Sequence, residues 1–325
     1  MREFLCKICT FTYIRLIHSP LEVVKKLIEI LDLECNVFNA HLQILFRGKP
    51  FYWGLKYKPQ VAPDRRLVIL ANGPSLNEDL ERLRKEDLSK TDFAMMNLSA
   101  NSDLFEEFQP KFYCLADHAF FRHVKAIDQI RNFYSNLDRK LTWNMTLVLA
   151  YNVKTVMEFS GLSNPNISYK RVYALESVGP KRFQEWICKR GHAIPGLGTV
   201  TNMAAFAGIQ YGYKQIEFCG NDMSFFDGIC VDDENHVCLY TRHFYDKMPE
   251  KKPFMIDDTT YQTLDSYVDM VQRMIVSHNR IAEYGKALGV RFINRTRNSM
   301  LDCYPRLIKL RPEAYENNPD LERNR

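Results

Sequence analysis

The chain has 325 residues, of which 46% are hydrophobic and 26% are charged, and its net charge is +5. This length is enough for one large α/β domain or two small ones. The mild positive charge suits an acidic ligand or an anionic membrane surface, and the absence of RRM, zinc-finger and helix-turn-helix signatures argues against nucleic acid as a partner.

Residues 1–60 are predicted to form an N-terminal helical extension. Residues 1–17 mix apolar and basic side chains, which is typical of a helix lying on an anionic membrane, or of a core-packed or dimer-forming helix. Ser19-Pro20-Leu21-Glu22 is a capping box that opens a further helix. No apolar run is long enough to cross a bilayer.

Residues 61–310 are predicted to form one α/β domain. A short apolar run at residues 67–70 leads into Asn72-Gly73-Pro74-Ser75, and a charged segment with leucines at helical spacing follows. This pattern indicates a buried strand, a tight turn and a helix. Gly73 lets the backbone approach a ligand closely, and N–H groups at the start of the next helix attract anions.

The alternation of strands and helices continues along the domain. Further strands are predicted at residues 93–96, 112–116, 145–149, 169–175, 215–219 and 290–293, and helices at 117–137, 199–212 and 264–288. This order predicts a Rossmann-like, mostly parallel, doubly wound sheet. Residues 223–262 are polar, aromatic and without periodicity, as expected of a lid or binding loop. Residues 311–325 are predicted to be a frayed tail.

Polar side chains follow the ends of the predicted strands. They are Asn72 and Ser75, Asn97, Asp117 and His118, Asn221 and Asp222, and Asn294 with Asn298 and Ser299. Ligands of open α/β sheets bind at the carboxyl ends of the strands, so this recurrence predicts a ligand-binding rim. The alternative is plain solvation of the strand ends.

The segment 223–262 contains a candidate general base, His243. Histidine is the side chain best suited to accept a proton near neutral pH. Asp246 is near enough in sequence to orient it, and Arg242 and Lys247 could neutralise a phosphate leaving group. The alternative is an ordinary histidine of a surface loop.

Metal sites are not expected. Cys230, His236, Cys238 and His243 do not have the spacing of a standard zinc site. The acidic pairs 232–233 and 257–258 could hold Mg²⁺, but such pairs at loop tips are more often solvated. The 9 cysteines are scattered and odd in number, which favours a reducing compartment over a disulfide framework.

The order of these motifs resembles the bacterial lipo-oligosaccharide sialyltransferases, glycosyltransferase family 42, over about residues 67–301. Residues 71–76 resemble the family's opening Gly-Asn-Gly-Pro-Ser-Leu, and Gly220-Asn221-Asp222 resembles its Gly-x-Asp. Tyr240-x-x-His243 resembles its Tyr-x-x-His, whose histidine is the catalytic base. Two departures concern the donor: residues 223–226 lack the family's phosphate-binding tyrosines, and residues 197–201 replace its Arg-x-x-Ser-Gly.

The resemblance implies a GT-A-variant fold and an inverting glycosyltransferase. The enzyme would use a CMP-activated sugar, such as sialic acid or another ulosonic acid, to extend a bacterial cell-surface glycan of lipopolysaccharide or capsule. His243 would be the general base, with Asp246 beside it. The donor site would comprise Asn72, Gly73, Pro74, Ser75, Asn97, Asp117, Thr199, Thr201, Asn221, Asp222, Tyr240 and Arg242.

The resemblance also sets expectations for partners and location. We expect a metal-independent reaction without a cofactor, a glycan or glycolipid acceptor, and assembly as a homo-oligomer. We expect the chain in the bacterial cytoplasm, peripherally on the inner face of the inner membrane through residues 1–60. Two alternatives stay open, because related families share the Asn-Gly-Pro-Ser turn. One is a Mg²⁺- and ATP-dependent diphosphokinase of the 6-hydroxymethylpterin type, and the other is a scaffold without catalysis.

Overall fold

The computed structural model describes residues 54–122, 128–150, 153–177, 180–240, 251–255 and 260–306. The helices predicted before residue 54, the predicted tail, and His243, Asp246 and Arg242 all lie outside these residues. Residues 54–60, the end of the predicted extension, are not helical. They run along the α/β domain, where Leu55 N–H donates to Arg171 O at 3.0 Å.

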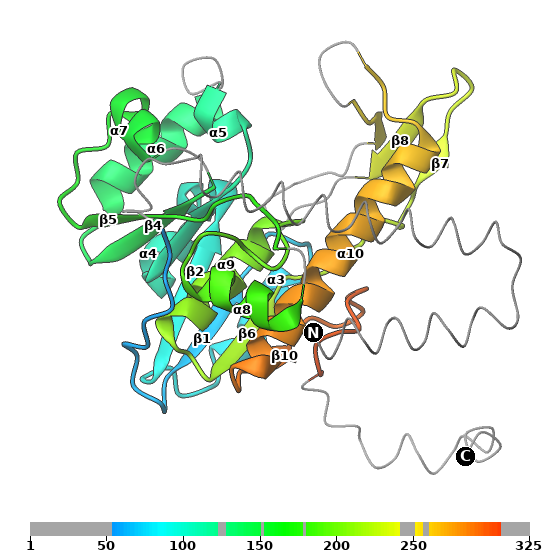
Figure 1. Ribbon diagram of the computed structural model, residues 1–325. Helices are drawn as coiled ribbons and strands as arrows, with labels where there is room; N and C mark the ends of the chain where they lie inside the picture. The colour runs from blue at the N-terminus through cyan, green and yellow to red at the C-terminus, as the bar shows by residue number, and fades with distance from the viewer. Residues whose placement is uncertain are drawn as a thin grey trace, which may run out of the picture.

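A seven-stranded sheet forms the centre of the molecule, in the order β10-β6-β1-β2-β3-β4-β5. Every neighbouring pair in it is parallel. Its strands are β1 (Arg66–Leu70), β2 (Thr91–Met96), β3 (Phe112–Leu115), β4 (Met145–Leu149), β5 (Ile167–Arg171), β6 (Gln215–Cys219) and β10 (Arg291–Asn294). This architecture confirms the predicted Rossmann-like α/β fold (Figure 1).

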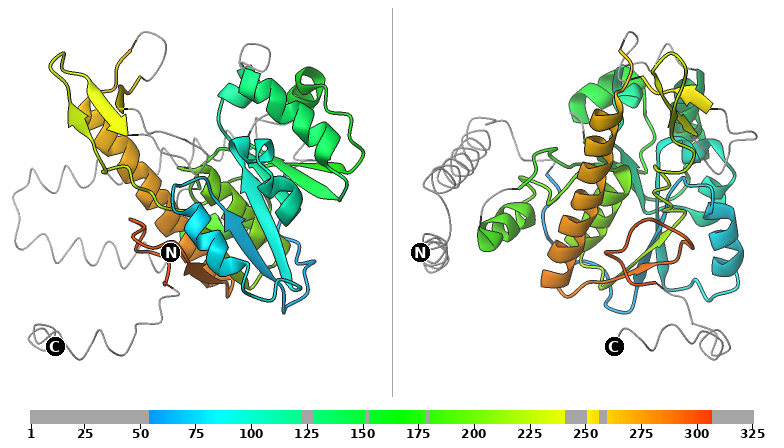
Figure 2. Two further views of the ribbon diagram at one scale, coloured as in Figure 1. Left: turned by 180° about the vertical axis from the view of Figure 1, so that it is seen from behind. Right: turned by 90° about the vertical axis from the view of Figure 1, so that its right-hand side faces the viewer.

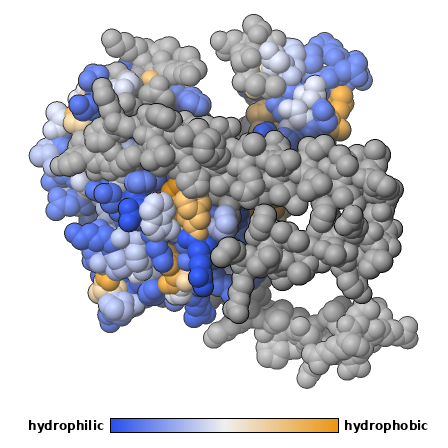
Figure 3. Space-filling model, in the orientation of Figure 1, coloured by the Kyte–Doolittle hydropathy of each residue, from blue (hydrophilic) through white to orange (hydrophobic). Residues whose placement is uncertain are grey.

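Helices cover both faces of the sheet, as the two views of Figure 2 show. They are α3 (Leu76–Leu83), η2 (Asn97–Asn101), α4 (Leu104–Phe108), α5 (Ala119–Arg122), α6 (Asp128–Lys140), α7 (Val153–Ser160), α8 (Lys181–Lys189), α9 (Val200–Tyr211) and α10 (Leu264–Ala287). Alternate strand residues point to opposite faces: Leu67 and Ile69 pack with α8, α9 and α10, whereas Val68 and Leu70 pack with α3, α4 and α6. The described surface in Figure 3 is mostly hydrophilic, because the apolar residues lie in these two cores.

The strand order places a topological switch point between β1 and β6. Strands β1 to β5 are added in one direction, and the chain then returns to add β6 on the other side of β1. Loops that leave two neighbouring strands in opposite directions open a crevice at the carboxyl ends of those strands. The loops in question are residues 71–75 after β1 and 220–222 after β6.

Residues 223–262 contain regular structure that the sequence did not predict. The described part forms a three-stranded antiparallel sheet of β7 (Cys230–Val231), β8 (Val237–Tyr240) and β9 (Lys251–Pro253). Val237 and Leu239 pack on Tyr267 and Val271 of α10, so this small sheet is carried by the first half of that helix (Figure 1). None of the described helices is apolar over a length that could cross a bilayer.

Candidate functional site

A cleft of about 340 Å³ opens at the switch point between β1 and β6. One wall is built by the loops after β1, β2 and β6 and by the N-terminus of α9. Eight residues of the predicted donor site line this wall: Asn72, Gly73, Pro74, Asn97, Thr199, Thr201, Asn221 and Asp222. The structure therefore brings together side chains that are up to 150 positions apart in the sequence.

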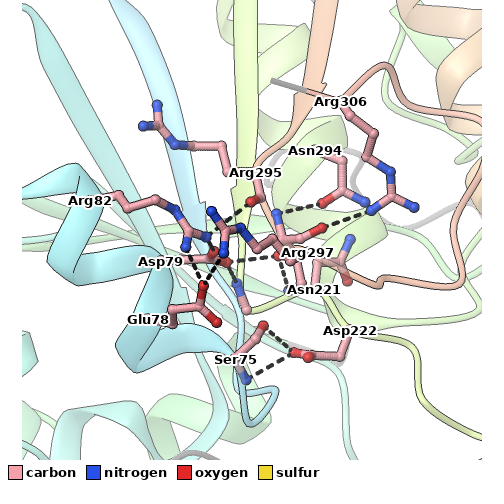
Figure 4. Close-up of polar contacts among 12 residues, drawn as sticks. Ser75, Glu78, Asp79, Arg82, Asn221, Asp222, Asn294, Arg295, Arg297 and Arg306 are labelled. Carbon is pink, nitrogen blue, oxygen red and sulfur yellow. Dashed lines mark hydrogen bonds and ion pairs between the residues drawn. The ribbon is translucent and has the colours of Figure 1, made fainter. Parts of the chain in front are cut away.

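Gly73 and Asp222 are in close contact at the base of the cleft. A Cβ atom on Gly73 would lie 1.9 Å from Asp222 Oδ2 and 2.5 Å from Gly220 O. Ser75 donates to the same Oδ2 through its hydroxyl, at 2.8 Å, and its backbone N–H, at 3.4 Å (Figure 4). Burial raises the pKa of the Asp222 carboxyl, and the two Ser75 hydrogen bonds oppose this effect. Ser75 itself does not line the cleft; it holds Asp222 in place.

Two of the three asparagines on this wall have a buried polar atom without a partner among the described residues. These atoms are Asn97 Oδ1, an acceptor, and Asn221 Nδ2, a donor. Asn72, in contrast, accepts a hydrogen bond from Ser99 Oγ at 2.7 Å and joins the ends of β1 and β2. Buried polar atoms normally have partners, so the two unpaired atoms are candidates for ligand contact.

Asp79 of α3 supports the turn after β6 from behind. Its Oδ2 accepts hydrogen bonds from Gly220 N, at 2.7 Å, and Thr296 Oγ1, at 2.9 Å, and its other oxygen pairs with Arg82 (Figure 4). Burial raises the pKa of this carboxyl, against the lowering effect of the Gly220 and Thr296 bonds. Thr296 Oγ1 in turn accepts the N–H of Asn221 at 3.0 Å. The sequence did not reveal this role, since Asp79 lies in a charged segment that reads as solvent-exposed.

The opposite wall is apolar and aromatic, and sequence reasoning missed the part of it that belongs to α10. It is formed by Phe225, Leu239, Phe254, Tyr267, Met270 and Met274. Tyr267 is anchored by a hydrogen bond from its hydroxyl to Phe225 O at 2.5 Å. The α10 residues have the helical spacing of ordinary core residues, so their pattern gave no signal of a binding wall.

Electrostatically, the described lining is neutral or acidic. Its charged side chains are Asp222 and Asp227, and among the described lining residues there is no lysine or arginine. The features that suit an anion are the first N–H groups of α9, where Val200 and Thr201 line the cleft. Thr199 caps this helix and forms a capping box with Asn202.

The remaining predicted residues lie elsewhere. Asp117 is exposed at the end of β3, where it accepts the N–H of Ala119 at 2.9 Å, and it does not line the cleft. Tyr240 ends β8, and only its backbone is described, while its neighbour Leu239 does line the cleft. His243, Asp246 and Arg242 are outside the described residues.

Two of the residues weighed as metal ligands, Asp232 and His236, have structural contacts. Asp232 accepts the N–H groups of Glu234, at 3.0 Å, and His236, at 2.8 Å, and so closes the turn between β7 and β8. His236 stacks on Tyr261 with ring centroids 3.7 Å apart. Within the part of the chain that the structure describes, no group of three His, Cys, Asp or Glu residues could hold a metal ion.

Comparisons with known proteins give likenesses among solved structures. No protein-family model and no curated protein matches the chain. Among solved structures, the sialyltransferase CstII from Campylobacter jejuni, in complex with the substrate analogue cytidine-5'-monophosphate, is 16% identical, with a TM-score of 0.36. The match covers 74% of this chain and 84% of that chain.

Proposed function

We propose that the chain is a glycosyltransferase that binds a nucleotide-activated sugar in the cleft between β1 and β6. The observation that carries this proposal is the convergence of three strand-end loops and the N-terminus of α9 opposite an aromatic wall. Switch points of open α/β sheets bind nucleotides, and ligand sites combine an apolar wall with a few convergent polar groups.

The donor's groups are assigned by the chemistry of the walls. The unpaired amide atoms of Asn97 and Asn221 would bind the base or ribose, which offer both donors and acceptors. The first turn of α9 would take the phosphate, because its N–H groups and dipole favour an anion. The apolar side chains of α10 would exclude water and so limit hydrolysis of the donor. The finer identity of the donor, a CMP-activated sugar, rests on the sequence motifs.

The transfer itself would be an inverting displacement. His243 would accept the proton of the acceptor hydroxyl as its oxygen bonds to the anomeric carbon, and the sugar–phosphate bond would break with the electron pair leaving on the nucleotide. Asp246 would orient His243. The acceptor glycan or glycolipid, the homo-oligomer and the peripheral inner-membrane location remain predictions from the sequence.

A melting screen tests the proposed ligand class. The full chain is heated with CMP, CDP, UDP, GDP or ATP, each with and without Mg²⁺. We expect CMP to raise the melting temperature without Mg²⁺; a ligand at 100 times its Kd adds about 2.7 kcal/mol of stability. A rise only with ATP and Mg²⁺ would favour the diphosphokinase, and no rise with any nucleotide would favour a scaffold.

A variant of the candidate base tests the reaction. We expect His243→Ala to keep CMP binding and to lose transfer by on the order of 100-fold or more, the usual contribution of a general base. His236→Ala is the matched control, because His236 belongs to the same segment and does not line the cleft. Wild-type turnover in His243→Ala would remove this residue from the mechanism.

A further inference from the structure

A chain of hydrogen-bonding groups leads from the cleft wall into the core. Thr201 Oγ1, at the wall, is 2.7 Å from Thr199 Oγ1, which is 3.0 Å from His278 Nε2. On the other side of the imidazole, His278 Nδ1 is 3.1 Å from the Tyr304 hydroxyl. His278 and Tyr304 are fully buried, with 0% and 1% of their surface exposed. These hydrogen-bonded side chains thus connect α9, α10 and the loop after β10.

The direction of these hydrogen bonds depends on which nitrogen of the His278 imidazole carries the hydrogen. Burial lowers the pKa of His278 to about 3, so the ring is neutral near pH 7. A neutral imidazole has one N–H donor and one acceptor nitrogen, and the partner of one nitrogen fixes the state of the other. If Nε2 donates, the hydroxyl hydrogens of Thr199 and Thr201 point towards the cleft. If Nε2 accepts, both point towards the core.

The surroundings of Tyr304 favour the first arrangement. Its hydroxyl has one hydrogen, and its nearest acceptors are His278 Nδ1, at 3.1 Å, and the His278 carbonyl oxygen, at 3.3 Å. That carbonyl lies inside α10, where it accepts the N–H of Ala282 in the regular helix pattern. The thiol of Cys303, which also lies beside the hydroxyl, is only a weak acceptor. The shorter contact favours the Tyr304 hydrogen on Nδ1, which puts the imidazole hydrogen on Nε2.

The partners of Thr199 are consistent with this direction. Its Oγ1 can accept from His278 Nε2 and from the N–H of Asn202, which is 3.3 Å away. Asn202 Oδ1, the competing acceptor at 3.0 Å, already receives the Thr199 N–H at 2.9 Å, and it shares the one hydrogen of the Ser277 hydroxyl, 2.7 Å away, with Met274 O, which is 2.6 Å from that hydroxyl. The Thr199 hydrogen is then available to Thr201, whose own hydrogen is directed into the cleft.

We propose that His278 is a positioning residue that, by donating through Nε2 to Thr199, makes the Thr201 hydroxyl a hydrogen-bond donor to an anionic ligand oxygen. This inference rests on the proposed function, in which that oxygen belongs to the donor phosphate. A hydroxyl held as a hydrogen-bond donor towards the cleft matters here, because the described lining has no cationic side chain that could bind the anion. In the opposite arrangement Thr201 would present lone pairs to an anion, which is unfavourable.

The tautomer of His278 is the direct test, and it requires no ligand. In the full chain labelled with ¹⁵N-histidine, the His278 signals are identified by their loss in His278→Gln. We expect a neutral ring with the hydrogen on Nε2 at pH 7. A hydrogen on Nδ1, or on both nitrogens, would overturn the proposal, whatever the chain binds.

Binding of CMP tests the connection to the cleft. We expect Thr201→Val to weaken CMP binding by about 10- to 100-fold, the range for a hydrogen bond to a charged group. His278→Asn should weaken it similarly, whereas His278→Gln, whose amide N–H can replace Nε2–H, should largely restore it. Thr146→Val is the control, because Thr146 is a buried threonine outside the cleft. Circular dichroism and melting establish that each variant is folded.

A double variant separates positioning from a general effect on the fold. If His278 acts through Thr201, then His278→Asn in the Thr201→Val background should cause little further loss of CMP affinity. Additive losses, or CMP affinity unchanged in His278→Asn, would overturn the proposal. If the wild-type protein does not bind CMP, the proposed donor is wrong. The ¹⁵N measurement still decides the direction of the hydrogen bonds between His278 and Thr201.

Discussion

Gly73→Ala tests whether the base of the cleft is as tightly packed as the structure indicates. The added Cβ would lie 1.9 Å from Asp222 Oδ2 and 2.5 Å from Gly220 O. Asp222 can turn away only by losing its hydrogen bonds from Ser75. Gly220 cannot turn away, because its oxygen is a backbone atom and its N–H is held by Asp79 at 2.7 Å. Relief of the second contact therefore requires a shift of the turn after β6.

The magnitude follows from these contacts. Overpacking costs about 1–3 kcal/mol, and the lost hydrogen bonds to a carboxylate cost about 1.5–3 kcal/mol. Replacing glycine by alanine lowers the conformational entropy of the unfolded chain, but this effect adds back only about 0.4–1 kcal/mol of stability. We expect a loss of about 2–5 kcal/mol in the free energy of unfolding, and a melting temperature lower by roughly 5–15 °C. We also expect loss of CMP binding.

Urea unfolding and the CMP melting shift measure both effects. Gly161→Ala is the control, because a Cβ there meets no atom within 4 Å. Because Gly161 has a positive φ of 68°, alanine at this position should lower the free energy of unfolding by about 1–2 kcal/mol, without affecting CMP binding. Asp222→Ala added to Gly73→Ala should recover only part of the stability, since the Gly220 contact remains. Wild-type stability and CMP binding in Gly73→Ala would refute the packing argument.

Three further predictions concern the groups behind the cleft. Because the native pKa of His278 is lowered to about 3, the unfolded chain binds a proton that the native chain does not. The free energy of unfolding should therefore fall by up to about 1.4 kcal/mol per pH unit as the pH drops from about 6.5 towards 3, and this slope should be smaller in His278→Gln. Equal slopes in urea titrations would contradict the assignment. Thr296→Val removes the acceptor of the Asn221 N–H and should cost about 1–3 kcal/mol; unchanged unfolding would argue that this bond contributes little. Arg295→Met deprives Glu217, whose side chain is 1% exposed, of one of its two ion-pair partners. It should cost up to about 3–5 kcal/mol, and a stabilised variant would show that the ion pair is dispensable.

The sequence predicted the central strands to within about two residues of the strands observed at β1 to β4 and β6. Each is a short apolar run bounded by turn residues, and that signal is local. The fifth strand was predicted at 169–175 and is observed at Ile167–Arg171, because this edge strand is only partly buried and its pattern is weak. Helix α8 was missed for a similar reason, since its buried residues are Ile187 and Cys188.

The sequence by itself determined that a parallel sheet would carry polar residues at its strand ends, because hydrophobic period and turn chemistry act over a few residues. Tertiary structure decided which of those ends meet. Ser75 and Asp222 are 147 positions apart, and Thr199 and His278 are 79 apart. The order β6-β1-β2 brings in Asn97 and leaves Asp117 outside the cleft. Tertiary structure also decided the apolar wall of α10 and the burial of His278, because both depend on packing between distant segments and not on any local pattern.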